Sequence, residues 1–241
     1  MVDMAVLDPP VAVLWDFDGT LVDTEKYWVD AEFAILAEYG VPWSQAQGKA
    51  LAGSSWQEST GQLLAQLRAH GVEPDVGPRE LYRRMYRSVA DRIRSDGLPW
   101  LPGARELLAD IQAAQVPQAL VSASPLAMLD VALDLIGRQV FAAVVDGTQL
   151  SRPKPDPQGY RLAADRLGVS ASACIVLEDS VPGCAAGVLA GAVVLAVPNQ
   201  VALPALPDQV IRHEGLDGLG WDDLRAIFRA VRPHHLAVAQ Q

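Results

Sequence analysis

Four of the short apolar runs in this chain are each followed directly by residues that can do chemistry. The runs are apolar on both faces, which is typical of strands in a buried parallel sheet. Ligands bind beyond the carboxyl ends of such strands, where neighbouring strand ends meet. We therefore expect one site, built from the residues that follow Val11–Trp15, Ala119–Val121, Ala142–Val145 and Cys174–Leu177: Asp16 with Asp18, Ser122 with Ala123, Asp146 with Lys154, and Glu178 with Asp179.

The residue types at this predicted site suit the transfer of a phosphoryl group. Clustered carboxylates without a histidine favour a hard cation bound through oxygen, hence Mg²⁺. Asp16 and Asp179 are the candidate ligands, and Glu178 lies either among them or just outside. Lys154, between two prolines, offers a fixed positive charge for phosphate oxygens. Ser122 and nearby backbone N–H groups complete the cradle for the phosphate.

Helical patterns alternate with these runs and with a fifth apolar run at Ala192–Val197. Such alternation is typical of an α/β fold, with a doubly wound, Rossmann-like parallel sheet and right-handed crossovers. The predicted helices of this part span Ala104–Ala114, Leu126–Ile136, Gln158–Leu167 and Gly183–Ala190, with a further helix at Asp222–Val231.

The segment from about Thr24 to Ser95 breaks this alternation, because it contains no strand-like run. It shows three helical patterns instead, at Tyr27–Tyr39, Trp56–His70 and Arg79–Arg94. Its charge also differs: residues 25–94 hold nine basic and nine acidic side chains, whereas the whole chain carries a net charge of −10. We therefore predict a helical unit inserted after the first strand.

Composition excludes several classes of protein. Half of the 241 residues are hydrophobic and 20% are charged, as in ordinary globular proteins, and the net charge of −10 argues against nucleic acid or an anionic membrane as partner. Cys174 and Cys184 provide neither a disulfide framework nor a four-ligand zinc site. The acidic start lacks the features of a signal peptide, so we expect a cytoplasmic protein, and we expect a monomer.

Four motifs, in order along almost the whole chain, resemble those of the haloacid dehalogenase superfamily, subfamily I. They are DFDGTLVDTE from Asp16, then Ser122, then Lys154 within RPKPDP, then EDSVPGCAAG from Glu178. The resemblance points to the branch of phosphatases and β-phosphoglucomutase-like enzymes. It implies a catalytic core formed by residues 1–23 and 96–241, with residues 24–95 as an inserted helical cap domain.

The resemblance also implies a role for each site residue. Asp16 would be the nucleophile that forms an aspartyl-phosphate, and Asp18 the general acid and base. Mg²⁺ would be held by the Asp16 carboxylate, the Asp18 backbone carbonyl and Asp179, with Glu178 in or next to its shell. Ser122, the Ala123 N–H and Lys154 would hold the phosphoryl group.

Asp18 argues against a dehalogenase, since dehalogenases that resemble this fold lack a second Asp at that position. We therefore predict a phosphatase of small phosphate monoesters, with a small phosphorylated metabolite as substrate. A sugar phosphomutase is the alternative, but Ala52, Trp56 and Trp28 stand where the mutase has Lys, Arg and His. A non-catalytic binding protein on the same scaffold is a third possibility, which the retention of Asp16, Asp18 and Lys154 disfavours.

Overall fold

The computed structural model describes residues 9–51, 54–199, 203 and 210–238, with side chains up to Val231. Its described residues form two compact units. The first combines the chain up to residue 22 with residues 100–123 and the chain from residue 138 onward, and the second combines residues 23–99 and 124–137. The predicted insert, residues 24–95, lies within the second unit, and its role as a cap stays a prediction.

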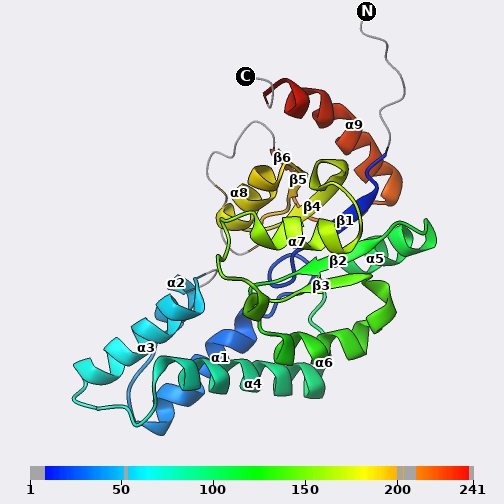
Figure 1. Ribbon diagram of the computed structural model, residues 1–241. Helices are drawn as coiled ribbons and strands as arrows, with labels where there is room; N and C mark the ends of the chain where they lie inside the picture. The colour runs from blue at the N-terminus through cyan, green and yellow to red at the C-terminus, as the bar shows by residue number, and fades with distance from the viewer. Residues whose placement is uncertain (1–8, 52–53, 200–202, 204–209, 239–241) are drawn as a thin grey trace, which may run out of the picture. The chain divides into compact units, whose positions relative to one another are not determined.

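A six-stranded parallel sheet forms the centre of the first unit (Figure 1). Its order is β3-β2-β1-β4-β5-β6, which is the strand order of dinucleotide-binding folds. The α/β prediction is therefore confirmed. The strands are β1 (Ala12–Trp15), β2 (Gln118–Val121), β3 (Ala143–Val145), β4 (Cys174–Glu178), β5 (Val193–Ala196) and β6 (Val210–Arg212).

Strand β6 was missed by the sequence analysis, which predicted loop after about residue 200 apart from one helix. β6 has only three residues, and one of them, Arg212, is exposed at the edge of the sheet. So short a run shows no periodicity, and the strand exists because its backbone pairs with β5.

Helices cover both faces of this sheet (Figure 1), which explains why its strands are apolar throughout. Tyr160 of α7 and Cys184 of α8 pack on one face. On the other face, Trp15 Nε1 donates to Gln118 Oε1 at 2.8 Å, and Gln118 Nε2 donates to the Leu108 carbonyl of α5 at 3.2 Å. The helices of this unit are α5 (Ala104–Ala113), α7 (Gln158–Arg166), α8 (Val181–Ala190) and α9 (Trp221–Val238), with 3-10 turns at Arg138–Val140, Gly147–Gln149 and Ala171–Ala173.

The described residues of the second unit form helices and connecting loops, without a strand. Its helices are α1 (Glu25–Glu38), α2 (Gln45–Ala50), α3 (Trp56–Ala69), α4 (Pro78–Asp96) and α6 (Leu126–Ile136). Apart from α2 and the longer α9, the predicted helices agree with the structure to within two residues at each end. The predicted helix ended at Val231, before Pro233, whereas α9 continues to Val238.

Helix α2 was missed because its six residues are too few to show a helical period. A local signal was nevertheless present. The Ser44 side chain accepts from the Gln47 N–H, and the Gln47 side chain accepts from the Ser44 N–H, which makes a capping box. Ser55 and Glu58 make the same arrangement at the start of α3.

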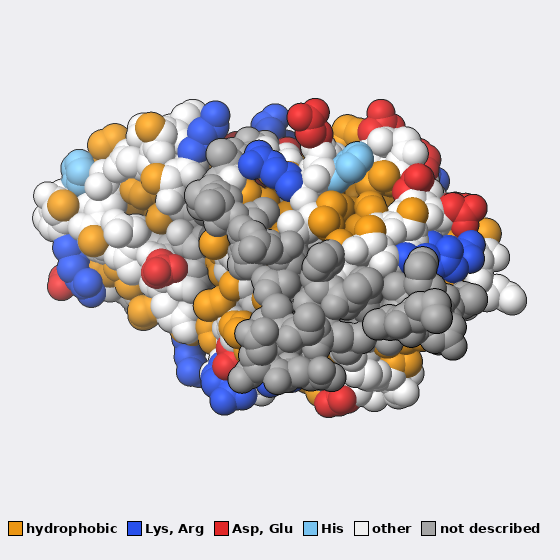
Figure 2. Space-filling model, turned by 90° about the horizontal axis from the view of Figure 1, so that it is seen from above, with side chains coloured by type: hydrophobic (Ala, Val, Ile, Leu, Met, Phe, Trp, Pro, Cys, Tyr) orange, Lys and Arg blue, Asp and Glu red, His pale blue; other side chains and the backbone are white. Residues whose placement is uncertain are grey.

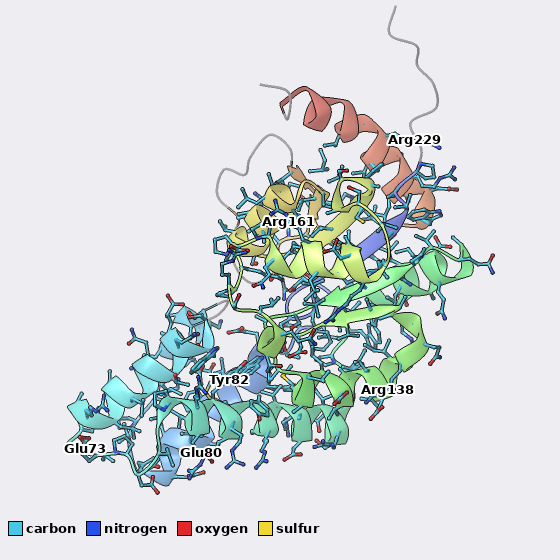
Figure 3. All side chains as sticks on the ribbon, in the orientation of Figure 1. Glu73, Glu80, Tyr82, Arg138, Arg161 and Arg229 are labelled. Carbon is cyan, nitrogen blue, oxygen red and sulfur yellow. The ribbon has the colours of Figure 1, made fainter. Side chains whose placement is uncertain are left out.

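Helix α4 carries six arginines, and most of them are paired with acids. Its buried stripe lies at helical spacing: Leu81, Met85, Val89, Ala90 and Ile93. On the outer side Glu80, labelled in Figure 3, bonds to Arg83 and lies 3.8 Å from Arg84. Arg92 and Arg94 pair with Asp96 and Asp91. The arginines of α4 therefore form a solvated face on which acidic neighbours balance most of the charge.

The surface shows a similar mixture of charges. On the face in Figure 2, Lys and Arg side chains lie interspersed with Asp and Glu rather than gathered by sign. Among the described helices, none is both long enough and apolar enough to span a membrane.

Glu32 is an unusual carboxylate in the second unit, because it is buried within a helical core. Only 3% of it is exposed, and Trp43 Nε1 donates to its Oε2 at 2.9 Å. A Cβ at Gly48 of α2 would lie 3.1 Å from the same oxygen, so the glycine leaves room for the carboxylate. Burial raises the pKa of Glu32 to about 7, against the opposing effect of the Trp43 bond.

We predict that Glu32 makes the protein less stable as pH rises. The folded state holds the Glu32 proton more tightly than the unfolded state, whose pKa is near 4.5, so stability falls between the two values. The Glu32→Gln variant lacks this proton. Between about pH 5 and about pH 8, the wild type should lose on the order of 1–3 kcal/mol more unfolding free energy than the variant.

Urea denaturation across this pH range measures the effect. Glu38→Gln is the matched control, since Glu38 lies on the same helix and its side chain is 57% exposed. Parallel stability profiles for wild type and Glu32→Gln would contradict the prediction.

Candidate active site

The predicted site residues are carried by strands at the centre of the sheet in the first unit. β1 and β4 are neighbours, and the strand order reverses between them. Asp16 follows β1, Glu178 is the last residue of β4, and Asp179 comes next. A crevice at such a reversal is where open α/β sheets bind ligands.

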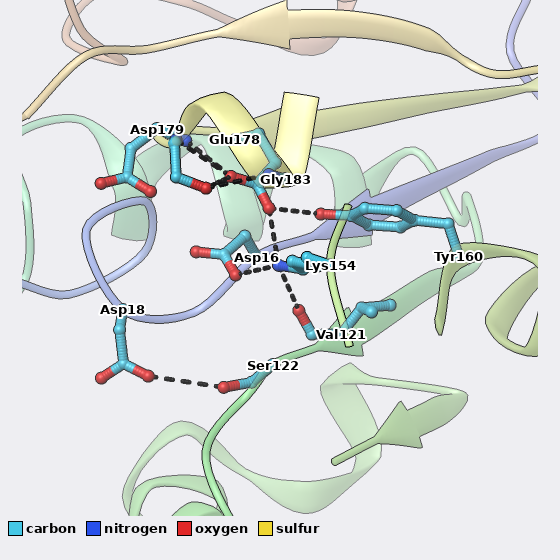
Figure 4. Close-up of polar contacts among 10 residues, drawn as sticks. Asp16, Asp18, Val121, Ser122, Lys154, Tyr160, Glu178, Asp179 and Gly183 are labelled. Carbon is cyan, nitrogen blue, oxygen red and sulfur yellow. Dashed lines mark hydrogen bonds and ion pairs between the residues drawn. The ribbon is translucent and has the colours of Figure 1, made fainter. Parts of the chain in front are cut away.

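The ammonium group of Lys154 joins these two strand ends (Figure 4). Its Nζ donates to Asp16 Oδ1 at 2.5 Å and to Glu178 Oε1 at 2.6 Å. The Val121 carbonyl, at the end of β2, accepts from the same nitrogen at 3.4 Å. The Lys154 side chain is only 14% exposed, so three chain segments meet at one largely enclosed cation.

Glu178 is fully buried, and both of its carboxylate oxygens are held. Oε1 accepts from Lys154 and from the Tyr160 hydroxyl, the latter at 2.8 Å. Oε2 accepts from the Asp179 and Ser180 N–H groups, each at 3.1 Å, and from Ser180 Oγ at 2.9 Å. Five donors thus compensate the desolvation of this carboxylate.

Tyr160 and Gly183 belong to this site, and the sequence analysis did not find them. Tyr160 lies on the apolar face of α7, so its spacing indicates only a core residue. Gly183 lies in the first turn of α8, where a Cβ would come within 1.8–2.1 Å of the Glu178 carboxylate. The only signal for Gly183 was its place in the fourth motif, five residues after Glu178.

The turn after β1 brings Asp18 to the same region. Gly19 N donates to the Val22 carbonyl at 2.8 Å, and Gly19 has φ +93°, a backbone conformation that favours glycine. A Cβ at Gly19 would lie 2.0 Å from Asp179 Oδ2, so the turn also requires glycine for space. Ser122 Oγ donates to Asp18 Oδ2 at 3.4 Å, which joins the turn to the end of β2 (Figure 4).

Two further residues named from the sequence have other surroundings. Ala123 is exposed after β2, and its carbonyl oxygen would be 2.1 Å from a Cβ at Gly147. Asp146 is fully buried, and its carboxylate accepts from Thr148 N at 2.9 Å and from the Gln149 side chain. Asp146 therefore caps the turn after β3 rather than facing Lys154.

Burial shifts the pKa values of the charged groups at this site. It raises the pKa of Asp16 to about 7, against the lowering effect of Lys154 and with a further rise from Glu178. Burial, together with Asp16 and Glu178, raises the pKa of Asp179 to about 9. Burial alone would lower the pKa of Lys154. The carboxylates of Asp16 and Glu178 outweigh this effect, so the pKa of Lys154 is raised.

These shifts fit a site for a cation. Asp16, Glu178 and Asp179 each offer a carboxylate oxygen, and the three oxygens lie within 4.8 Å of one another. One ammonium group cannot compensate three carboxylates, so two of them are driven toward protonation. A divalent cation bound through oxygen would supply the missing charge, and an all-oxygen donor set suits Mg²⁺.

Comparison with known proteins supports this interpretation of the motifs. A family model described as haloacid dehalogenase-like hydrolase matches residues 11–191. Hexitol phosphatase B from Escherichia coli is 32% identical over 178 residues, which cover 72% of this chain and 77% of that protein. β-Phosphoglucomutase from Bacillus subtilis is 30% identical over 186 residues, which cover 73% of this chain and 77% of that protein.

Solved structures share the fold. CbbY from Rhodobacter sphaeroides, with structures in complex with phosphate and, for a mutant, with xylulose-1,5-bisphosphate, is similar with a TM-score of 0.78. The similarity covers 90% of this chain and 99% of that chain at 22% sequence identity. At this identity the likeness confirms the fold, and it leaves the reaction to be argued from the site.

The closeness of Gly183 to Glu178 predicts an effect on stability. In the Gly183→Ala variant, the new methyl group must displace a carboxylate held by five donors. The unfolding free energy should fall by about 1–3 kcal/mol. Gly61→Ala is the matched control, because nothing lies within 4 Å of a Cβ there, and it should raise stability by about 0.5–1 kcal/mol. Urea denaturation compares the two, and a Gly183→Ala variant as stable as wild type would mean that Glu178 is not held.

Proposed function

We propose that this chain, which belongs to the haloacid dehalogenase-like hydrolases, is a Mg²⁺-dependent phosphatase of small phosphate monoesters, with sugar phosphates and their relatives as the substrate class. The observation that carries the proposal is the cluster of Asp16, Glu178 and Asp179 around the Lys154 ammonium, at the reversal point of the sheet. Buried carboxylates beside one fixed cation suit the binding of a phosphoryl group together with a metal ion.

Asp16 is the proposed nucleophile. One of its oxygens attacks phosphorus, the bond from phosphorus to the ester oxygen breaks, and an aspartyl-phosphate forms. Asp18 gives a proton to the departing alcohol oxygen, then takes one from the water that hydrolyses the intermediate. The products are the alcohol and inorganic phosphate, and both carboxyl groups return to their starting states. Asp16 is 6% exposed, and Lys154 orients its Oδ1, which leaves Oδ2 for the attack.

Lys154, Ser122 and the Ala123 N–H are proposed to hold the phosphoryl group. Lys154 already lies between two strand ends with its charge fixed, so no reorganisation is needed when negative charge develops on phosphate oxygens. Ser122 is buried at the end of β2 and contacts Asp18, which places a hydroxyl beside the proposed acid and base.

Asp16, Asp179 and the Asp18 backbone carbonyl are the proposed holders of Mg²⁺. The bound ion would neutralise charge between the nucleophile and the phosphate. Glu178 is proposed to lie next to this set and not within it, because five donors already occupy its two oxygens.

The preference for the organic part of the substrate is proposed to depend on an aromatic cluster of the second unit. Trp28 of α1 and Trp56 of α3 stack on Tyr82 of α4, with ring centroids 6.1 and 5.6 Å apart. Tyr86 contacts Tyr82 edge to face at 5.5 Å. All four rings are partly exposed, and aromatic faces suit the C–H groups of a ring or polyol better than they suit a second phosphate.

Sugar phosphomutase activity is the second candidate, because β-phosphoglucomutase is among the relatives. A mutase must hold a second phosphate, and the positions that resemble its clamp carry Ala52, Trp56 and Trp28. Ala52 lies outside the described residues, whereas the two tryptophans belong to the aromatic cluster. Charge-assisted hydrogen bonds to phosphate are strong, so their loss favours the hydrolase.

A binding protein without activity is disfavoured by the complete site, and the expected partner is a small phosphorylated metabolite. The expectations of a cytoplasmic location and a monomeric state remain part of the proposal.

The first test is phosphate release from a panel of phosphorylated sugars, polyols and other metabolites. Release should require Mg²⁺, stop with EDTA, and fall by about a thousandfold or more in Asp16→Asn. Asp165→Asn, an exposed position on α7, is the matched control and should remain active. Interconversion of β-glucose 1-phosphate and glucose 6-phosphate after priming with a bisphosphate, without net release, would establish the mutase instead. Silence in both assays would contradict the proposal.

The second test concerns the aromatic cluster. Trp56→Arg and Trp28→His should shift the ratio of kcat/KM values from a polyol monophosphate toward a hexose bisphosphate, by about tenfold for the arginine. Trp221→Arg adds the same charge on α9 of the first unit and should leave the ratio unchanged. Unchanged preference in both cluster variants would show that this cluster does not influence the choice of substrate.

A further inference from the structure

We propose that Tyr160 is a positioning residue for the reaction: its buried hydroxyl holds Glu178 so that the Lys154 ammonium points toward Asp16 and the phosphoryl group. This inference rests on the proposed phosphatase function. It assigns to a core tyrosine of α7 a role in placing the cation that the chemistry needs.

The hydroxyl of Tyr160 and the ammonium of Lys154 share one acceptor. Tyr160 donates to Glu178 Oε1 at 2.8 Å, and Lys154 donates to the same atom at 2.6 Å. Oε2 is held separately by the backbone and hydroxyl of the next residues. The bond from Tyr160 thus completes the set of donors around Glu178. Together these donors hold the carboxylate in a single orientation, in which Oε1 points at Lys154.

The orientation of Lys154 follows from that of Glu178. An ammonium group has three N–H donors, and Lys154 directs them at Asp16, Glu178 and the Val121 carbonyl. The contact to Val121 is the longest at 3.4 Å, so its N–H is the one that a phosphate oxygen can draw away most easily. If Glu178 turned, the ammonium would follow it and leave this position.

Because Tyr160 and Lys154 share Glu178 Oε1, the hydrogen bond from Lys154 to this oxygen is also weaker than it would be alone. An oxygen that accepts from two donors binds each of them less tightly than it would bind one alone. Without the hydroxyl, Oε1 would bind the ammonium more closely and draw it away from Asp16 and the phosphate. Both effects of the hydroxyl therefore act in the same direction.

The packing of Tyr160 does not by itself require a hydroxyl. Tyr160 is fully buried in the apolar cluster between α7 and the sheet, where a phenylalanine ring would fill the same space. A buried hydroxyl is costly without a partner, and Glu178 Oε1 accepts the hydrogen bond of this one. Burial raises the pKa of Tyr160, so the hydroxyl keeps its proton and remains a donor.

The ring of Tyr160 makes a second contact, which the test must separate from the first. Lys154 Nζ lies 5.2 Å from the ring centroid, within the range of a cation–π interaction. Tyr160→Phe keeps the ring and its contact with Lys154, and removes only the hydrogen bond to Glu178. This variant therefore isolates the proposed role.

The experiment measures kcat and KM for phosphate release, and the dissociation constant of inorganic phosphate by calorimetry with Mg²⁺ present. In Tyr160→Phe we expect kcat to fall about tenfold and the phosphate dissociation constant to rise about fivefold, because Lys154 is displaced. The midpoint of thermal unfolding should change by only a few degrees, about what one buried hydrogen bond contributes.

Gln118→Leu is the control for a merely structural effect. It removes a buried side chain that bonds to Trp15 and to the Leu108 carbonyl, at the start of β2 and apart from Glu178 and Lys154. It should lower the unfolding midpoint as much as Tyr160→Phe or more, yet leave the phosphate dissociation constant at the wild-type value.

A double-variant cycle with Glu178→Ala tests whether Tyr160 acts through Glu178. In that background, Tyr160→Phe should not weaken phosphate binding further, whereas an equal further loss would overturn the proposed route. If Glu178→Ala does not fold, the comparison of Tyr160→Phe with Gln118→Leu decides the question.

Wild-type kcat and phosphate affinity in Tyr160→Phe would overturn the inference, while the proposed phosphatase function would stand. A wild-type protein that neither releases nor binds phosphate would overturn the proposed function itself.

Discussion

The ion pair network around Lys154 is the interaction on which the rest of the site depends. Its ammonium group bonds to Asp16 and Glu178, and these carboxylates belong to the ends of neighbouring strands. Burying two acids and one base is tolerable only when each is paired and hydrogen-bonded. The third carboxylate, Asp179, exceeds what one ammonium can balance. The site is therefore built with a deficit of positive charge, which a divalent cation and a positioned lysine together can meet.

The backbone around this network holds it in place, because two glycines approach its carboxylates closely. The turn after β1 requires Gly19, because a Cβ there would overlap Asp179. The first turn of α8 requires Gly183, because a Cβ there would overlap Glu178. These glycines, together with Tyr160, restrict the acids to one arrangement. Such restriction suits a reaction whose barrier is lowered mainly by charges that are already in position.

The second unit depends mainly on local helix signals and apolar packing rather than on buried ion pairs. Its helices are defined by local signals, with capping boxes at Ser44 and Ser55 and an apolar stripe along α4. Its described residues also include an aromatic cluster, in which Trp28 and Trp56 stack on Tyr82. In the proposed function, this cluster influences the preference for the organic part of the substrate.

The sequence by itself determined the fold class, most helix boundaries and the order of the motifs that carry Asp16, Ser122, Lys154 and Glu178, since periodicity, turn residues and motif spacing are local properties. It missed α2 and β6, which are too short to show a period. It also left open whether Glu178 binds metal, and it assigned no role to Tyr160. Only the tertiary structure shows the five hydrogen bonds to Glu178, because their donors come from three separate segments of the chain. Hydrogen bonds between separate segments produce no periodic pattern in the amino-acid sequence, so sequence analysis cannot detect them.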